Sequence, residues 1–235
     1  MAKKKKNSNY ITAKKVAAAK EAAELARKRK KLSVIICAAV AVLLIVAIAV
    51  SLVAIGKKRG WKTDMTVTHH ATIDVLGYGE IHLELYGNEA PITVANFVKL
   101  AEEGFYDGLT FHRIISGFMM QGGDPEADGS GDSGTDIFGE FEKNGFYNAI
   151  KHERGTISMA RASDPNTASC QFFIVHKTSA NNTASLDGKY AAFGKVTSGI
   201  EIVDLICGDA NPGDDGAIAK DQQPVIMSIT IHPAH

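Results

Sequence analysis

The sequence predicts a mainly β domain, folded as a closed antiparallel barrel with helices over its ends and preceded by one transmembrane helix. Three observations lead to this fold class. An uncharged apolar run occupies residues 32–55. Several short segments after it alternate apolar and polar residues, as strands do. Only two helical patterns interrupt these segments, and that mixture in about 170 residues is typical of a barrel with helical caps.

The apolar run from Leu32 to Ile55 is long enough to cross a bilayer. As a helix rising about 1.5 Å per residue it reaches about 36 Å, against a hydrocarbon core of about 30 Å. A cleaved signal peptide is the alternative, but its apolar region is shorter, about 7–15 residues. Moreover, Ala47-Ile48-Ala49, a sequence of the type cut by signal peptidase, lies inside the run. We therefore expect an uncleaved anchor.

The charge changes sign across this run. Residues 1–31 contain 12 Lys or Arg and 2 Asp or Glu, whereas residues 63–235 contain 10 and 24. Because basic residues concentrate on the cytoplasmic side of a membrane span, we expect a cytoplasmic N-terminus and an extracytoplasmic domain at the cell membrane. An acidic domain also argues against binding to nucleic acid, which requires a basic surface.

These features divide the chain into four parts. The sequence predicts a basic cytoplasmic tail at 1–31, the transmembrane helix at 32–55, a linker at 56–65 and a folded domain at 66–235. We expect this single-pass protein to be a monomer.

The folded domain begins with a hairpin pattern. Alternation at 67–75 and 80–85 flanks the turn Gly77-Tyr78-Gly79. An apolar stripe at positions 94, 97, 98 and 101 then predicts an amphipathic helix between Pro91 and Gly104. Further strands are predicted at 111–115, 118–121, 156–159, 172–175 and 192–196, a second helix at 199–206 ended by Gly208, and a last strand in which Val225, Met227, Ile229 and Ile231 alternate with polar residues.

Several familiar kinds of site are disfavoured by their surroundings. Residues 129–134 match the spacing GxGxxG, but no helical pattern follows, and neighbouring aspartates would repel a pyrophosphate. The histidines are scattered without zinc-ligand spacing. Cys170 and Cys207 are expected to be free, mostly buried thiols. We expect neither a metal nor an organic cofactor.

Three segments combine Phe and Met with single polar residues. They are FHRIISGFMMQGGD at 111–124, GTISMARASDPNTASCQFFIV at 155–175 and LDGKYAAFGKV at 186–196. No paired acid and base stands among these residues, which argues against a hydrolase. The pattern favours an apolar cleft with one strong hydrogen-bond donor, suited to gripping a polypeptide.

In this order, the three segments closely resemble the signature of cyclophilins, FHRxIxxFMxQGGD, SMAxxxxNTxxSQFFI and LDGxxxxFGxV, over about residues 68–233. The resemblance implies an eight-stranded barrel capped by two helices and peptidyl-prolyl cis-trans isomerase (rotamase) activity. With the predicted topology, it implies an enzyme that assists the folding of extracytoplasmic proteins by acting on proline-containing unfolded or partly folded polypeptides. The alternatives are a weakly active peptide-binding module or holdase chaperone, and a scaffold that acts through its tail and anchor.

The resemblance also assigns residues. Arg113 matches the catalytic arginine, and a second group matches substrate-binding positions: Phe118, Met119, Gln121, Ala160, Arg161, Gln171, Phe173, Leu186 and Tyr190. Tyr190 stands where better-known members carry histidine, Arg161 replaces a common asparagine, and Ser185 stands where many members carry tryptophan. His112 is expected to be structural, with a hydrogen-bonded ring in the barrel wall.

Overall fold

Two strands pair at the start of the domain, as the alternation predicts. In the computed structural model, which describes residues 63–178 and 183–234, β1 (His69–Val75) runs antiparallel to β2 (Gly79–Leu85). Alternate residues of both strands are buried, among them Ile73 and Ile81. The predicted hairpin is confirmed.

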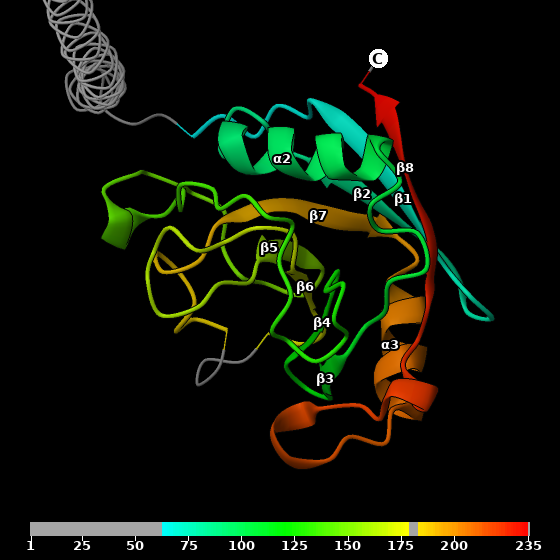
Figure 1. The fold of residues 1–235 in the computed structure, drawn as a ribbon. Helices are drawn as coiled ribbons and strands as arrows, with labels where there is room; N and C mark the ends of the chain where they lie inside the picture. Colours follow the sequence, from blue (N-terminus) through cyan, green and yellow to red (C-terminus); the bar gives the residue numbers. More distant parts are fainter. Residues whose placement is uncertain (1–62, 179–182, 235) are drawn as a thin grey trace, which may run out of the picture. The chain divides into compact units, whose positions relative to one another are not determined.

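The remaining strands complete one antiparallel sheet of eight strands (Figure 1). Its order is β3-β4-β6-β5-β7-β2-β1-β8, so strands distant in the sequence become neighbours. The added strands are β3 (Arg113–Ile115), β4 (Met119–Gly122), β5 (Thr156–Met159), β6 (Phe172–Val175), β7 (Ala192–Ser198) and β8 (Ile226–Pro233).

The sheet is a curled half-barrel, so the predicted closed barrel is wrong in this respect. Its edge strands β3 and β8 share no ladder. The chain just before each of them makes an isolated bridge instead, between Thr110 and Val225. Phe111 N–H donates to Pro224 O over 2.9 Å, but proline has no N–H with which to extend the pairing.

Strand β8 also differs from its predicted alternation. The register with β1 shifts between Asp74 and Val75, which face Ser228 and Ile226, so that Met227 is an extra residue in a bulge. Ile226 is consequently buried, whereas Met227 is 47% exposed. A bulge reverses which residues face the core, and the sequence pattern alone does not reveal it.

Two helices pack against different parts of the curled sheet (Figure 1), and both bury side chains in the same hydrophobic core. α2 (Pro91–Glu102) begins at a proline, as predicted, and buries Val94 and Phe97. α3 (Ile200–Asp209) is longer than predicted, because it continues through the exposed Gly208. A helical glycine costs only about 1 kcal/mol, and the helix ends instead at Ala210, whose backbone is extended two residues before Pro212.

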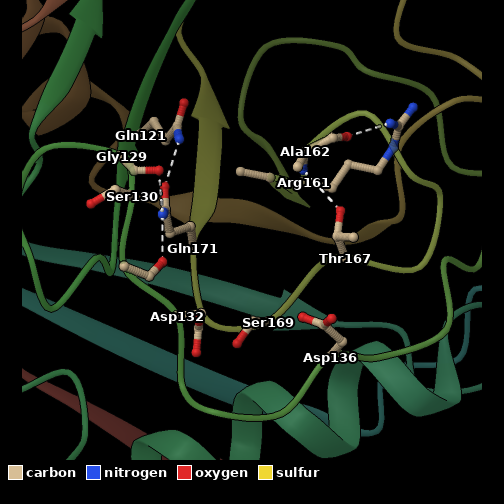
Figure 2. A pocket seen from close by; sticks show the side chains of 12 residues that line it. Gln121, Gly129, Ser130, Asp132, Asp136, Arg161, Ala162, Thr167, Ser169 and Gln171 are labelled. Carbon is tan, nitrogen blue, oxygen red and sulfur yellow. Dashed lines mark hydrogen bonds between the residues drawn. The ribbon is translucent and has the colours of Figure 1, made fainter.

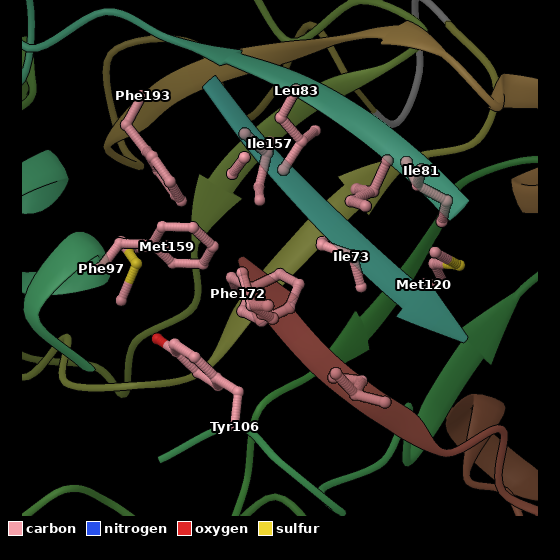
Figure 3. Close-up of a cluster of buried hydrophobic side chains, with 14 of the residues drawn as sticks. Ile73, Ile81, Leu83, Phe97, Tyr106, Met120, Ile157, Met159, Phe172 and Phe193 are labelled. Atoms are coloured by element: carbon pink, nitrogen blue, oxygen red, sulfur yellow. The ribbon is translucent and has the colours of Figure 1, made fainter. Parts of the chain in front are cut away.

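An aromatic cluster fills the space between α2 and the sheet (Figure 3). The Phe172 ring makes edge contacts with Phe97, Tyr106 and Phe111, with ring centroids 5.6, 5.6 and 6.0 Å apart. Such pairs add roughly 0.5–1.5 kcal/mol to the burial of their area. The cluster therefore stabilises the position of β6 from the core side of the sheet. Cys170 and Cys207 are free and buried, as predicted.

The predicted tail and transmembrane helix, residues 1–31 and 32–55, lie outside the described residues, as does most of the linker. Within residues 63–178 and 183–234, no helix has both the length and the apolar character needed to cross a membrane.

Candidate active site

One cleft of about 280 Å³ collects nine of the ten residues assigned from the sequence. The tenth, Gln171, lies in an adjoining hollow. The cleft residues come from β3, the turn between β3 and β4, β4, β6, the chain following β5 and the turn before β7: Arg113, Phe118, Met119, Gln121, Ala160, Arg161, Phe173, Leu186 and Tyr190.

The apolar wall of the cleft is a hydrophobic cluster separate from the main core. Met119, Phe173 and Val175 form its buried part, and Phe118 and Leu186 pack against them. The alternation of each strand explains the separation. On β6, Phe172 enters the core while Phe173 faces the cleft; on β4, Met120 enters the core while Met119 faces the cleft.

Arg113 is held at the polar side of the cleft by two hydrogen bonds. Its Nε donates to Asp215 O over 2.8 Å, and its Nη1 to Gln121 Oε1 over 3.4 Å. Asp215 has a φ of +57°, a conformation that non-glycine residues rarely adopt. A guanidinium has five N–H donors, and those of Arg113 that remain make no hydrogen bond to another described residue. They are available to a ligand.

A chain of amides links Arg113 to the hollow shown in Figure 2. Gln121 Nε2 donates to Gln171 Oε1 over 2.8 Å, and Gln171 Nε2 donates to the carbonyls of Gly129 and Gly131 over 3.1 and 2.8 Å. The hollow shares Gln121 with the cleft, and its walls carry the exposed carboxylates of Asp132 and Asp136. The two spaces adjoin, since Gln121, Ala160 and Arg161 line both of them.

Arg161 supports the wall of the cleft through its side chain. Its guanidinium carbon lies 4.6 Å from the centroid of the Tyr190 ring and 5.2 Å from that of Phe141. Nε and Nη2 donate to Lys189 O over 3.0 and 2.9 Å. Tyr190 in turn meets Phe173 edge-on, with centroids 6.0 Å apart. The charge of Arg161 is therefore engaged with backbone carbonyls and aromatic rings.

Behind Phe173 lies a buried network that sequence reasoning missed. The His152 ring stacks on Phe173, with centroids 5.9 Å apart and planes at 16°. Its Nδ1 lies 2.9 Å from Asp187 Oδ1 and its Nε2 lies 3.0 Å from Ser158 Oγ. Burial lowers the pKa of His152, although Asp187 opposes this. Because Ser158 is fully buried, this trio positions Phe173 and is not a nucleophilic triad. The sequence feature that could have indicated this network was Asp187, which lies within the LDG motif.

His112 is structural in its burial, but its predicted hydrogen bonds are absent. The residue is 3% exposed, and neither ring nitrogen has a partner among the described residues. Burial lowers the pKa of His112, with Asp124 opposing the shift.

Comparisons with known proteins agree with this fold and cleft. The family model of cyclophilin-type peptidyl-prolyl cis-trans isomerases matches residues 70–231. Peptidyl-prolyl cis-trans isomerase B of Bacillus subtilis is 52% identical over 122 residues, covering 52% of this chain and 79% of the relative. A Helicobacter pylori peptidyl-prolyl cis-trans isomerase is 43% identical over 145 residues, covering 61% and 83%.

A solved structure has the same fold. The crystal structure of a Cryptosporidium parvum cyclophilin-type isomerase, determined in the presence of the dipeptide Ala-Pro, superposes with a TM-score of 0.60 and 31% identity. The match covers 70% of this chain and 99% of that one. The chain therefore belongs to the cyclophilin family and is a peptidyl-prolyl cis-trans isomerase.

Proposed function

We propose that this isomerase is anchored by residues 32–55 and assists the folding of extracytoplasmic proteins, with Arg113 as its catalytic residue. The observation that carries the catalytic part is that one cleft contains both a guanidinium with donors not bonded to described residues and an apolar wall of Phe, Met and Leu side chains. The uncharged run and the basic tail before it support the location.

Amide resonance explains why a single donor suffices. Rotation about the bond before proline must break a partial double bond, with a barrier of about 18–20 kcal/mol. In the twisted state the proline nitrogen regains a localised lone pair and becomes a hydrogen-bond acceptor. Arg113 can donate to that nitrogen only when conjugation is lost, so the interaction stabilises the transition state selectively.

The apolar wall supplies the second requirement, which is to hold the ring while the preceding carbonyl rotates. Phe118, Met119, Phe173 and Leu186 would contact the ring, and the adjoining hollow at Gln171 would take the neighbouring backbone. Ala160 lines both the cleft and the hollow. No step needs a nucleophile, since no covalent bond is made or broken.

The hollow predicts a preference for basic residues near the proline. The carboxylates of Asp132 and Asp136 line the hollow, and the guanidinium of Arg161 lies over the Tyr190 ring. Since exposed ion pairs contribute roughly 0.2–1 kcal/mol each, a lysine reaching the hollow should raise kcat/KM about two- to fivefold. The measurement compares kcat/KM for a series of alanine peptides in which a single lysine occupies successive positions on either side of the proline. Asp132→Asn with Asp136→Asn should abolish the gain, whereas Glu201→Gln, at an exposed position of α3 that does not line the hollow, should leave it.

The location is tested with the full-length chain in cells. We expect protease added to intact cells or right-side-out vesicles to remove a C-terminal epitope tag and to spare an N-terminal one, because the 12 basic residues of 1–31 keep the tail inside. Complete protection of the C-terminal tag until lysis, or a mature N-terminus that begins after Ala49, would contradict the anchored topology.

A further inference from the structure

The turn between β3 and β4 carries Phe118 and is clamped by His176. The backbone N–H of Gly117 donates to His176 Nδ1 over 3.0 Å. The backbone N–H of His176 donates to Phe118 O over 2.9 Å. His176 directly follows β6 and is 3% exposed, so its ring is shielded from water, and its contact with Gly117 is partly buried. His176 therefore holds the turn by two hydrogen bonds, one to its side chain and one from its backbone.

The second ring nitrogen of His176 reaches α3. Nε2 lies 3.0 Å from Asp204 Oδ1, and Arg154 binds the same carboxylate through Nη1 and Nη2 over 2.7 and 2.6 Å. Arg154 Nη1 also donates to His176 O over 2.6 Å. Nε2 of the ring is thus bound to the carboxylate of the Arg154–Asp204 ion pair, and Nδ1 holds the Phe118 turn.

Only one protonation state satisfies both ends. A backbone N–H can only donate, so Nδ1 must be unprotonated toward Gly117; a carboxylate can only accept, so Nε2 must carry the proton. The ring is then the neutral Nε2–H tautomer. A second proton would place an N–H on Nδ1 facing the N–H of Gly117, and that hydrogen bond would be lost.

We propose that His176 is a positioning residue for the isomerase reaction, which holds the Phe118 wall of the cleft only while its imidazole is neutral. The inference rests on the proposed role of Phe118 in holding the proline ring. Acidification would release the turn at Gly117 and reduce activity while the rest of the fold persists.

The charged groups around His176 set the pH at which the turn is released. Burial lowers the pKa of His176, Asp204 on α3 raises it, and Lys177 and Arg154 lower it. Cys207, the other ionisable group on α3 in this cluster, has a pKa raised to about 12 by burial and stays neutral. The turn itself contributes Ser116 and Gly117, which do not titrate. Because the folded-state pKa lies below the ordinary value of about 6.5, the clamp is intact at neutral pH and is lost as the pH falls below that value.

The test compares kcat/KM between pH 8 and 5 for the full-length wild type, His176→Asn and His176→Leu. Losing one hydrogen bond is worth roughly 1 kcal/mol, so we expect the wild type to fall about three- to tenfold at acid pH. Asparagine places a non-titrating acceptor near the position of Nδ1, so its profile should be flat and close to the wild type at pH 8. Leucine should be low at every pH. His82→Asn, at a half-exposed histidine on the outer face of β2, is the matched control and should follow the wild type.

Nuclear magnetic resonance separates this proposal from the catalytic one. The wild-type His176 ring should show the Nε2–H tautomer, and its titration should move the Gly117 amide signal with the same midpoint as the activity. A wild type without activity would overturn the catalytic proposal, while the Gly117 titration would still decide the clamp. The role of His176 would be overturned if His176→Asn still lost activity at acid pH, or if the Gly117 amide signal did not change as the His176 ring titrates. Either result would point to His152 or His112 as the titrating group.

Discussion

Replacing Arg113 with alanine is expected to lower kcat/KM for an Ala-Pro peptide about 100- to 1,000-fold, which is the usual cost of removing one donor aimed at developing charge. The physical reason is that Arg113 makes only two hydrogen bonds to described residues, whereas Arg161, the other guanidinium of the cleft, donates through all three of its nitrogens to the carbonyls of Lys189, Ala162 and Ser163. The measurement is a protease-free isomerisation assay on the full-length chain in mild detergent.

Two further variants make this result interpretable. Arg113→Lys keeps the charge but cannot bond Asp215 O and Gln121 Oε1 while presenting a third donor, so it should recover only a small part of the activity. Lys99→Ala removes a positive charge from the exposed face of α2 and should behave as the wild type. A folded Arg113→Ala protein with undiminished turnover would remove Arg113 from the mechanism and favour a cleft that works by shape alone.

Replacing Phe172 with alanine is expected to lower the free energy of unfolding by about 3–5 kcal/mol. The Phe172 ring is fully buried and touches three other aromatic rings. The neighbouring Phe173→Ala should cost less stability, because Phe173 faces the cleft, yet it should reduce kcat/KM at least tenfold through loss of the proline pocket. Denaturant unfolding and the isomerisation assay, run on both variants, measure the two effects separately.

The two residues are adjacent in the sequence, so each variant is the control for the other. Phe172→Leu should restore most of the stability by refilling the space. If Phe172→Ala lost activity while it remained folded, or if Phe173→Ala unfolded the domain as strongly as Phe172→Ala, the separation of core and cleft along β6 would be wrong.

Much of the fold could be predicted because local patterns in this chain agree with the tertiary structure. The hairpin of β1 and β2 and the start of α2 followed from alternation and from Pro91. The errors arose where long-range pairing decides. The bulge at Met227 and the open edge beside Pro224 depend on partners distant in the sequence.

The candidate site shows the same division. The motif residues could be named because the three segments resemble the cyclophilin signature, which contains several of them in each segment. The supports behind them could not: His152 lies 35 residues from Asp187, Gly117 lies 59 residues from His176, and Arg113 bonds a carbonyl 102 residues away. No periodicity within a segment encodes such contacts.

The sequence by itself determined the mainly β class, the acidic domain after an uncharged run, and the identity of the residues that line the cleft. Short-range steric and hydrophobic preferences suffice for the first two features, since they act within a strand or a helix turn, whereas the cleft residues followed from the resemblance of the three motif segments to the cyclophilin signature. Only the tertiary structure decided that the sheet stays open, that Arg161 buttresses Tyr190, and that His176 holds the Phe118 turn as a neutral ring. Hydrogen bonds and ring contacts between distant segments exist only once the sheet has brought those segments together, and their geometry then sets which donors are free and which groups can titrate.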